Sequence, residues 1–97
     1  MTNLGKVAQL KQLLQGMERD LGVDKLSSIQ RNIVYSAKLL SSDDNVVETD
    51  DLRNHELLSG VSRSTFFRAL KVLVEAGYLS HKEGKKRSAY IISTKLK

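Results

Sequence analysis

The segment that decides the fold of this chain is Val61-Ser62-Arg63-Ser64-Thr65-Phe66-Phe67-Arg68-Ala69-Leu70-Lys71. Its apolar residues recur at helical spacing and continue to Val74, and Ser62 precedes them as a candidate N-cap. Val61 and Phe66 occupy the two positions of a hydrophobic staple. Gly77 is the expected stop, because glycine accepts the left-handed backbone conformation beyond a helix end. The pattern predicts a helix over residues 62–76, with Arg68 and Lys71 on its outer face.

The positive charge of the chain is concentrated on this helix and the segment that follows it. Residues 61–88 contain seven Lys or Arg and two Glu, a net charge of +5, which equals the net charge of the whole chain. The other nine cations are therefore cancelled by the other nine anions. A polyanion is the expected partner of such a surface, and nucleic acid is the commonest one.

Two further helices are predicted near the N-terminus. Residues 3–20 carry one apolar stripe at steps of three and four, and Gly22 is a plausible stop. Residues 27–40 follow, with Ser27 and Gln30 placed for a capping box. The expected inner face of this second helix consists of Ile29, Ile33, Ala37 and Leu40, flanked by Val34 and Tyr35.

The remaining elements are short. Residues 46–48 suit a brief strand, and Thr49 is expected to cap a third helix over residues 50–58. After the helix at 62–76, residues 78–82 and 88–93 are predicted to form two strands joined by a turn at 83–87. The order is helix, helix, strand, helix, helix, strand, strand.

The bulk composition limits the protein class. Ninety-seven residues make one small domain, and the absence of cysteine excludes disulfides and thiolate metal sites. No apolar run approaches the roughly 20 residues of a membrane span, and polar residues interrupt the N-terminus where a secretory signal would lie. A soluble protein of the cytoplasm is expected.

The predicted order resembles a winged-helix domain. The segment from Gly60 to Thr65, continuing to Leu70, is similar to the turn and recognition helix of winged helix-turn-helix regulators, especially the MarR-like transcriptional regulator group. Leu73, Gly77, Tyr78 and Leu79 resemble the exit from that helix into the wing, and the resemblance covers residues 24–93. It implies a mainly α fold with a small β wing, as one domain over residues 1–97. An extra N-terminal helix at 1–22 would precede a winged-helix body at 24–97.

The resemblance also implies that the helix at 62–76 enters the major groove of double-stranded DNA, with the wing at 82–88 on the minor groove or the backbone. Arg68 would contact guanine or a phosphate, and the hydroxyls of Ser64 and Thr65 would contact phosphates. Phe67 has two interpretations, contact with a thymine methyl or packing on a neighbouring helix. The candidate DNA-binding residues are Ser62, Arg63, Ser64, Thr65, Phe67, Arg68, Lys71, Lys82, Lys85, Lys86 and Arg87.

The apolar stripe of the first helix also has two interpretations: it covers the domain's own core, or it pairs with its twin in a second subunit. MarR-like proteins usually carry a C-terminal helix that pairs subunits, whereas here the last predicted strand ends at residue 93. The first helix is therefore the expected dimerisation element of a homodimer. The candidate dimerisation residues are Leu4, Val7, Leu10, Leu13, Leu14 and Met17.

One departure from the family pattern concerns the third helix. A large apolar residue usually precedes the turn glycine, but Ser59 precedes Gly60 here, with Leu57 and Leu58 upstream. The third helix is therefore expected to be shorter or differently angled than in the family.

The predicted function is sequence-specific binding of double-stranded DNA by a small dimeric transcriptional regulator. One alternative is a replication or chromosome-organising protein that binds DNA with low specificity. Another is a winged helix that contacts a protein instead of DNA. No metal site, cofactor or enzyme activity is predicted, because His55 and His81 are remote in sequence and no nucleophile or phosphate-loop motif is present. The acidic residues at 43–51 lack the spacing of a calcium loop, and no residue points to a small-molecule effector.

Overall fold

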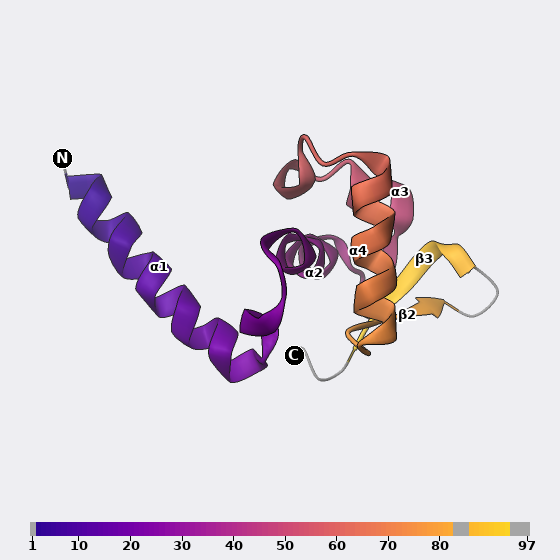
Figure 1. Ribbon diagram of the computed structural model, residues 1–97, viewed down its shortest axis with the longest axis horizontal. Helices are drawn as coiled ribbons and strands as arrows, with labels where there is room; N and C mark the ends of the chain where they lie inside the picture. The colour runs from indigo at the N-terminus through magenta and orange to yellow at the C-terminus, as the bar shows by residue number, and fades with distance from the viewer. Residues whose placement is uncertain (1, 83–85, 94–97) are drawn as a thin grey trace.

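The computed structural model describes residues 2–82 and 86–93, which form a mainly helical protein with a small antiparallel sheet. Figure 1 shows one long helix projecting from a body in which the other elements pack together. In chain order the elements are α1 (Thr2–Leu21), the 3₁₀ turn η1 (Val23–Lys25), α2 (Ser28–Leu40), β1 (Val46–Glu48), α3 (Thr49–Arg53), the 3₁₀ turn η2 (Glu56–Leu58), α4 (Arg63–Glu75), β2 (Leu79–Lys82) and β3 (Lys86–Ile92).

The sheet has three antiparallel strands in the order β1-β3-β2, so the last strand lies in the centre. Val47 is opposite Tyr90 on one side, and His81 is opposite Tyr90 on the other. The register between β2 and β3 shifts after His81, and Lys82 is opposite Lys86. Both strands were predicted, but β3 begins two residues before the predicted start at 88, and β2 begins at Leu79 instead of 78.

The hydrophobic core lies between α2, α4 and the sheet. It is built from side chains of every one of these elements, and α3 and η2 close it with one leucine each. Its best buried members include Ile33, Leu52, Phe66, Leu70, Leu73 and Leu79. The core holds α4 by one face, so the opposite face of this helix is directed to solvent.

Both ends of α4 are formed as the sequence predicts. The Ser62 side chain accepts a hydrogen bond from the Thr65 backbone N–H at 3.2 Å. At the other end Gly77 has φ of 87°, and the Tyr78 N–H donates to the Leu73 carbonyl at 2.9 Å. This is the Schellman arrangement, which needs a residue with positive φ and therefore favours glycine.

The second helix follows its prediction at the start and departs from it at the end. Ser27 and Gln30 form the predicted capping box, with reciprocal hydrogen bonds of 3.0 and 3.2 Å. The assignment of Leu40 to the inner face was wrong, because its side chain is 39% exposed. Val34 and Ser36 are buried instead, so the buried face turns toward α3 and η2 and misses the last residue of the helix.

The prediction of a single third helix over 50–58 was wrong. The chain forms α3 only as far as Arg53, and a separate turn η2 begins at Glu56. The N-cap is Glu48, and Thr49 is the first helical residue. The break lies where the His55 side chain accepts the Leu57 N–H at 3.2 Å and starts the second turn. The expected difference in length or angle from the family stays a prediction. Leu58 rather than Leu57 fills the core, since Leu57 is 40% exposed and Leu58 is 3% exposed.

Among the described residues, the side-chain hydrogen bond and the ion pair that join α1 to the body both come from its last turn. The Tyr35 hydroxyl donates a hydrogen bond to the Glu18 carboxylate, and Arg31 lies 3.7 Å from the same group. The Tyr78 hydroxyl donates to the Gly22 carbonyl at 3.1 Å. The longest extent of the molecule is 50 Å against a shortest of 24 Å, because the rest of α1 extends away from the body. Within the described residues, no helix combines the length and apolarity needed to cross a bilayer.

Candidate nucleic-acid interface

The outer face of α4 presents a row of cations. Arg68 and Lys71 are exposed, and the helix periodicity places them on the side of α4 away from the buried Phe66 and Leu73. Arg63 is exposed on the first turn, on the same side as Phe67. Among the described residues none of these three cations has a carboxylate within ion-pair distance, whereas Arg31 and Glu18 do form an ion pair. Cations without an ion-pair partner are available to an anionic ligand, but the exposed Glu75, one turn from Lys71 on the same side of α4, lowers the positive potential there. This row is the part of the predicted DNA-binding set that α4 brings together.

Three hydroxyls gather at the first turn of the same helix. The Ser62 Oγ donates to the Thr65 Oγ1 at 2.9 Å and lies 3.4 Å from the Ser64 Oγ. Ser62 therefore acts first as the helix cap. Ser64 is exposed and Thr65 is half-buried, so Ser64 is the freer of the two to meet a ligand. Hydroxyl donors at a helix N-terminus suit phosphate oxygens, because the helix dipole adds positive potential there.

Phe67 lies between the core and the exposed face. Its ring meets that of Phe66 edge-on, with centroids 5.1 Å apart, and it packs against the core from outside. The guanidinium of Arg63 lies over the same ring, 5.0 Å from its centroid. Of the two interpretations of Phe67, packing is therefore present in this structure, and the half-exposed ring also supports the position of Arg63.

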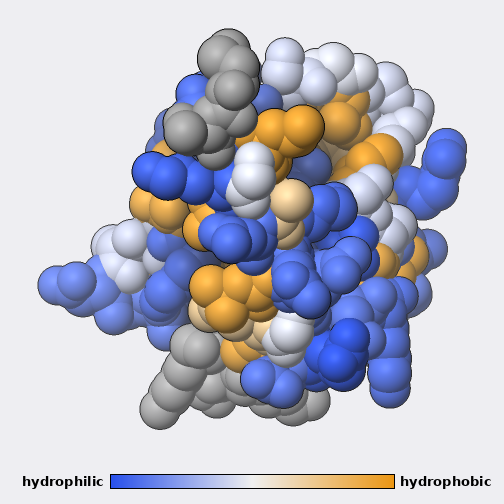
Figure 2. Space-filling view, turned by 90° about the vertical axis from the view of Figure 1, so that its left-hand side faces the viewer, coloured by the Kyte–Doolittle hydropathy of each residue, from blue (hydrophilic) through white to orange (hydrophobic). Residues whose placement is uncertain are grey.

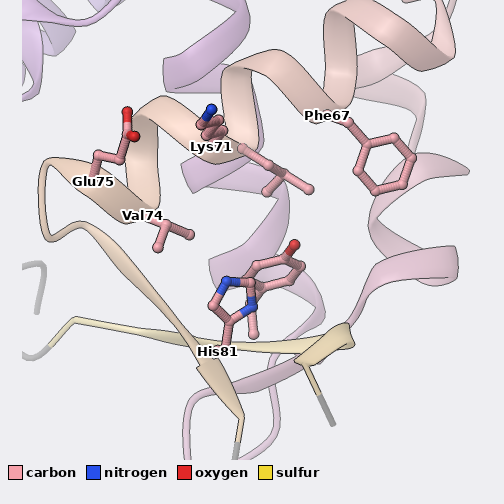
Figure 3. A pocket seen from close by; sticks show the side chains of 7 residues that line it. Phe67, Lys71, Val74, Glu75 and His81 are labelled. Atoms are coloured by element: carbon pink, nitrogen blue, oxygen red, sulfur yellow. The ribbon is translucent and has the colours of Figure 1, made fainter.

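A cavity of about 330 Å³ opens between one side of α4 and the strands β2 and β3 (Figure 3). His81 points from β2 toward the helix, and Val74 points from the helix toward the sheet. Phe67, Lys71 and Glu75 line the helix side of the cavity. Sequence analysis did not foresee it, because its walls come from segments that are adjacent only after β3 pairs with β2. Lys71 of α4 and His81 of β2 therefore line the same cavity.

The hairpin carries the other half of the predicted set. Lys82 ends β2 and is half-buried, and the backbones of Lys86 and Arg87 begin β3. The predicted contact residue Lys85 and the turn over 83–85 lie outside the described residues. The hairpin follows α4 directly through the Gly77 turn, so the two basic segments belong to one continuous unit.

The acidic residues at 43–51 occupy a different part of the fold. Asp50 and Asp51 are exposed in the first turn of α3, and Glu48 lies on β1, the edge strand on the far side of β3 from β2. A hydrogen bond from the Ser42 hydroxyl holds the pKa of the Asp44 carboxyl below its usual value. Among the described residues no group of three or more potential metal ligands comes together. The central strand lies between β1 and β2, but the Asp44 carboxylate is close enough to Lys82 of β2 for the two charges to attract each other.

His55 has a structural role that sequence analysis did not assign. Its Nδ1 accepts the Leu57 N–H and lies 3.2 Å from the Oγ of Ser36, which is fully buried. Asn32 adds a longer hydrogen bond, 3.4 Å, to the Leu57 carbonyl. These contacts fix η2, and with it the turn into α4, against α2. Ser36 and His55 are 19 residues apart in sequence, and Asn32 and Leu57 are 25 apart, so no local sequence pattern predicts these contacts.

No protein-family model, no curated protein and no solved structure matches this chain.

Proposed function

We propose that this protein is a winged-helix DNA-binding protein, with α4 as its recognition helix and the β2–β3 hairpin as its wing. It would act as a small dimeric transcriptional regulator in the cytoplasm, reading double-stranded DNA through the major groove. The observation that carries the proposal is the concentration of the net charge of +5 on residues 61–88, where the exposed face of α4 holds three cations without acidic partners among the described residues.

The element order supports the assignment. A capped helix is preceded by a short helix and a tight turn, and it is followed at once by an antiparallel hairpin. In a winged helix this order sets the recognition helix in the major groove and the hairpin beside it. The buried face of α4 rests on the core, so docking needs no rearrangement of the helix.

The charges allow an estimate of the salt dependence. Neutralising five to seven phosphates gives a log–log slope of binding against salt of roughly −4.5 to −6 on B-DNA. Few side chains on α4 are positioned to read bases, Arg68 chiefly, so one copy would discriminate weakly between sequences. Two copies on a two-fold site would double the number of base contacts.

The test is fluorescence anisotropy with a random-sequence duplex over a series of salt concentrations. We expect Lys71→Ala and Lys86→Ala to reduce the slope by about 0.9 each, the value of one phosphate contact. Arg68→Ala should lower affinity, and selection of a preferred sequence should show whether it also relaxes base preference. The matched control is Lys25→Ala, which removes an exposed cation from η1 and should leave the slope unchanged.

Three outcomes would separate the candidate functions. Steep binding with a selectable preferred sequence supports the regulator. Steep binding without any sequence preference would favour a DNA-organising protein. An absence of binding at low salt would refute DNA binding and leave the protein-interaction alternative. An equal effect of Lys25→Ala would refute the assignment of the interface to α4 and the hairpin.

A further inference from the structure

The apolar stripe of α1 does not cover the core of its own chain. The side chains of Leu4, Val7, Leu10, Leu13, Leu14 and Met17 are 45% to 76% exposed. Figure 2 views the molecule from the side on which α1 projects, and hydrophobic side chains are exposed there among hydrophilic ones. A helix of 20 residues without packing on its apolar face is marginal in water, and Gly5 and Gly16 weaken this one further. Such a stripe requires a partner.

The contacts of α1 leave one flank of the stripe free. On one flank, Glu18 is held by Tyr35 and Arg31 of its own chain. The other flank carries Lys6, Leu13 and Asp20, spaced by seven residues and all exposed. A spacing of seven returns to nearly the same face of a helix, so these three side chains form one row beside the stripe.

The charges of that row favour an antiparallel pair. Lys6 lies just beyond the first turn of α1, which has no acidic residue, and Asp20 lies in the last turn beside Arg19. Within its own helix, Lys6 therefore gains nothing from the helix dipole. In an antiparallel pair centred on Leu13, each Lys6 faces Asp20 of the second copy, and the two Leu13 side chains meet at the axis. A parallel pair would instead bring Lys6 toward Lys11 of the second copy, which is repulsive.

We propose that α1 binds a second copy of this chain through an antiparallel helix pair, with the Lys6–Leu13–Asp20 row centred on its two-fold axis. The pairing rests on α1 alone, whereas its use on DNA rests on the proposed function. With Leu13 at the axis, the body of each copy is attached eight residues away at Leu21, so the two attachment points would lie about 24 Å apart along the pair. The half-sites of a two-fold operator are about 34 Å apart, and the bodies extend beyond these attachment points (Figure 1).

Disulfide cross-linking can test the orientation in the full chain, since the sequence has no cysteine. We expect Leu13→Cys to form a covalent dimer under mild oxidation. Val7→Cys and Met17→Cys should cross-link when mixed and much less when each is alone, because antiparallel pairing brings these two positions together. Gln12→Cys, on the opposite face of α1, is the matched control and should not cross-link. Self-linking of Val7→Cys as efficient as that of Leu13→Cys would overturn the antiparallel arrangement.

A charge exchange provides a second test, read by sedimentation over a range of concentrations. Lys6→Glu should raise the dissociation constant of the dimer by about tenfold, since two ion pairs become repulsive. Adding Asp20→Lys in the same chain should restore it. In a parallel dimer Lys6→Glu would strengthen association, because the introduced carboxylate would then approach Lys11 of the second copy. A wild-type chain that stays monomeric throughout the range would also refute the proposal.

The failure of the pairing can be distinguished from the failure of DNA binding. Dimerisation is measured without DNA, so its loss leaves the salt-dependent binding of a single body intact. Conversely, a covalent Leu13→Cys dimer that binds no DNA would uphold the helix pair and refute the proposed function.

Discussion

Replacing His55 by alanine should destabilise the protein, because the Leu57 N–H and the Ser36 hydroxyl would both lose the ring nitrogen that accepts their hydrogen bonds. The Nδ1 of His55 accepts the Leu57 N–H at 3.2 Å, so this nitrogen carries no proton, and the Ser36 hydroxyl at 3.2 Å must donate to it. Loss of a side chain that caps a helical turn costs about 1 kcal/mol. Leaving the fully buried Ser36 hydroxyl without its acceptor costs about 1 kcal/mol more.

The expected loss of about 2 kcal/mol would lower the melting temperature by about 8–16 °C for a domain of this size. Thermal unfolding followed by circular dichroism measures it. The matched variant is His55→Asn, whose side-chain oxygen can stand near the position of Nδ1 and which caps helices well. It should retain most of the stability.

A double substitution isolates the buried hydroxyl. In the His55→Ala protein the buried Ser36 hydroxyl has no acceptor. Ser36→Ala removes that unpaired hydroxyl, so it should destabilise the His55→Ala protein less than it destabilises the wild type. Equal losses for His55→Ala and His55→Asn would refute the hydrogen-bond argument and assign the effect to packing alone.

Three further predictions concern other parts of the fold. Burial, together with the hydrogen bond to Glu18, raises the pKa of Tyr35 to about 12. The fold thus favours the protonated phenol, so its contribution to stability is complete below pH 10.0 and is lost as the pH rises toward 12. Phenolate absorbance should show a late-ionising tyrosine that ionises earlier in Glu18→Gln. Ser62→Ala should cost about 1 kcal/mol in thermal unfolding, and Ser62→Asp, which can still cap α4, should cost much less. Gly77→Ala should cost about 1–2 kcal/mol, because its φ is 87°, whereas Gly16→Ala, with open space around its Cα, should increase helicity; an equal loss from both would contradict the argument.

Most helix boundaries could be predicted from motifs whose residues are close together in the sequence. The N-cap at Ser62, the capping box at Ser27 and the stop at Gly77 each depend on residues within a few positions of one another. These motifs satisfy backbone groups that the helix itself leaves unpaired, so their sequence signature is direct. The wrong predictions concern elements whose ends depend on contacts between residues far apart in the sequence. The third helix ends early because His55 reaches both Leu57 and Ser36, and only the first of these is its sequence neighbour.

In the candidate site, too, features set by sequence neighbours could be predicted, whereas features set by distant contacts could not. Helical spacing alone placed Arg68 and Lys71 on the exposed face of α4, and both are exposed. The half-buried position of Phe67 depends on tertiary packing, and the cavity beside it depends on the pairing of His81 with Tyr90.

The stripe of α1 shows what periodicity cannot decide. An amphipathic helix has the same sequence pattern whether it covers its own core or a partner, because the pattern records only that one face avoids water. The decision here depends on where Glu18 is held, since the contacts with Tyr35 and Arg31 attach only the last turn and leave the stripe uncovered. The row of Lys6, Leu13 and Asp20 then becomes informative, because its charges suit a second copy running in the opposite direction.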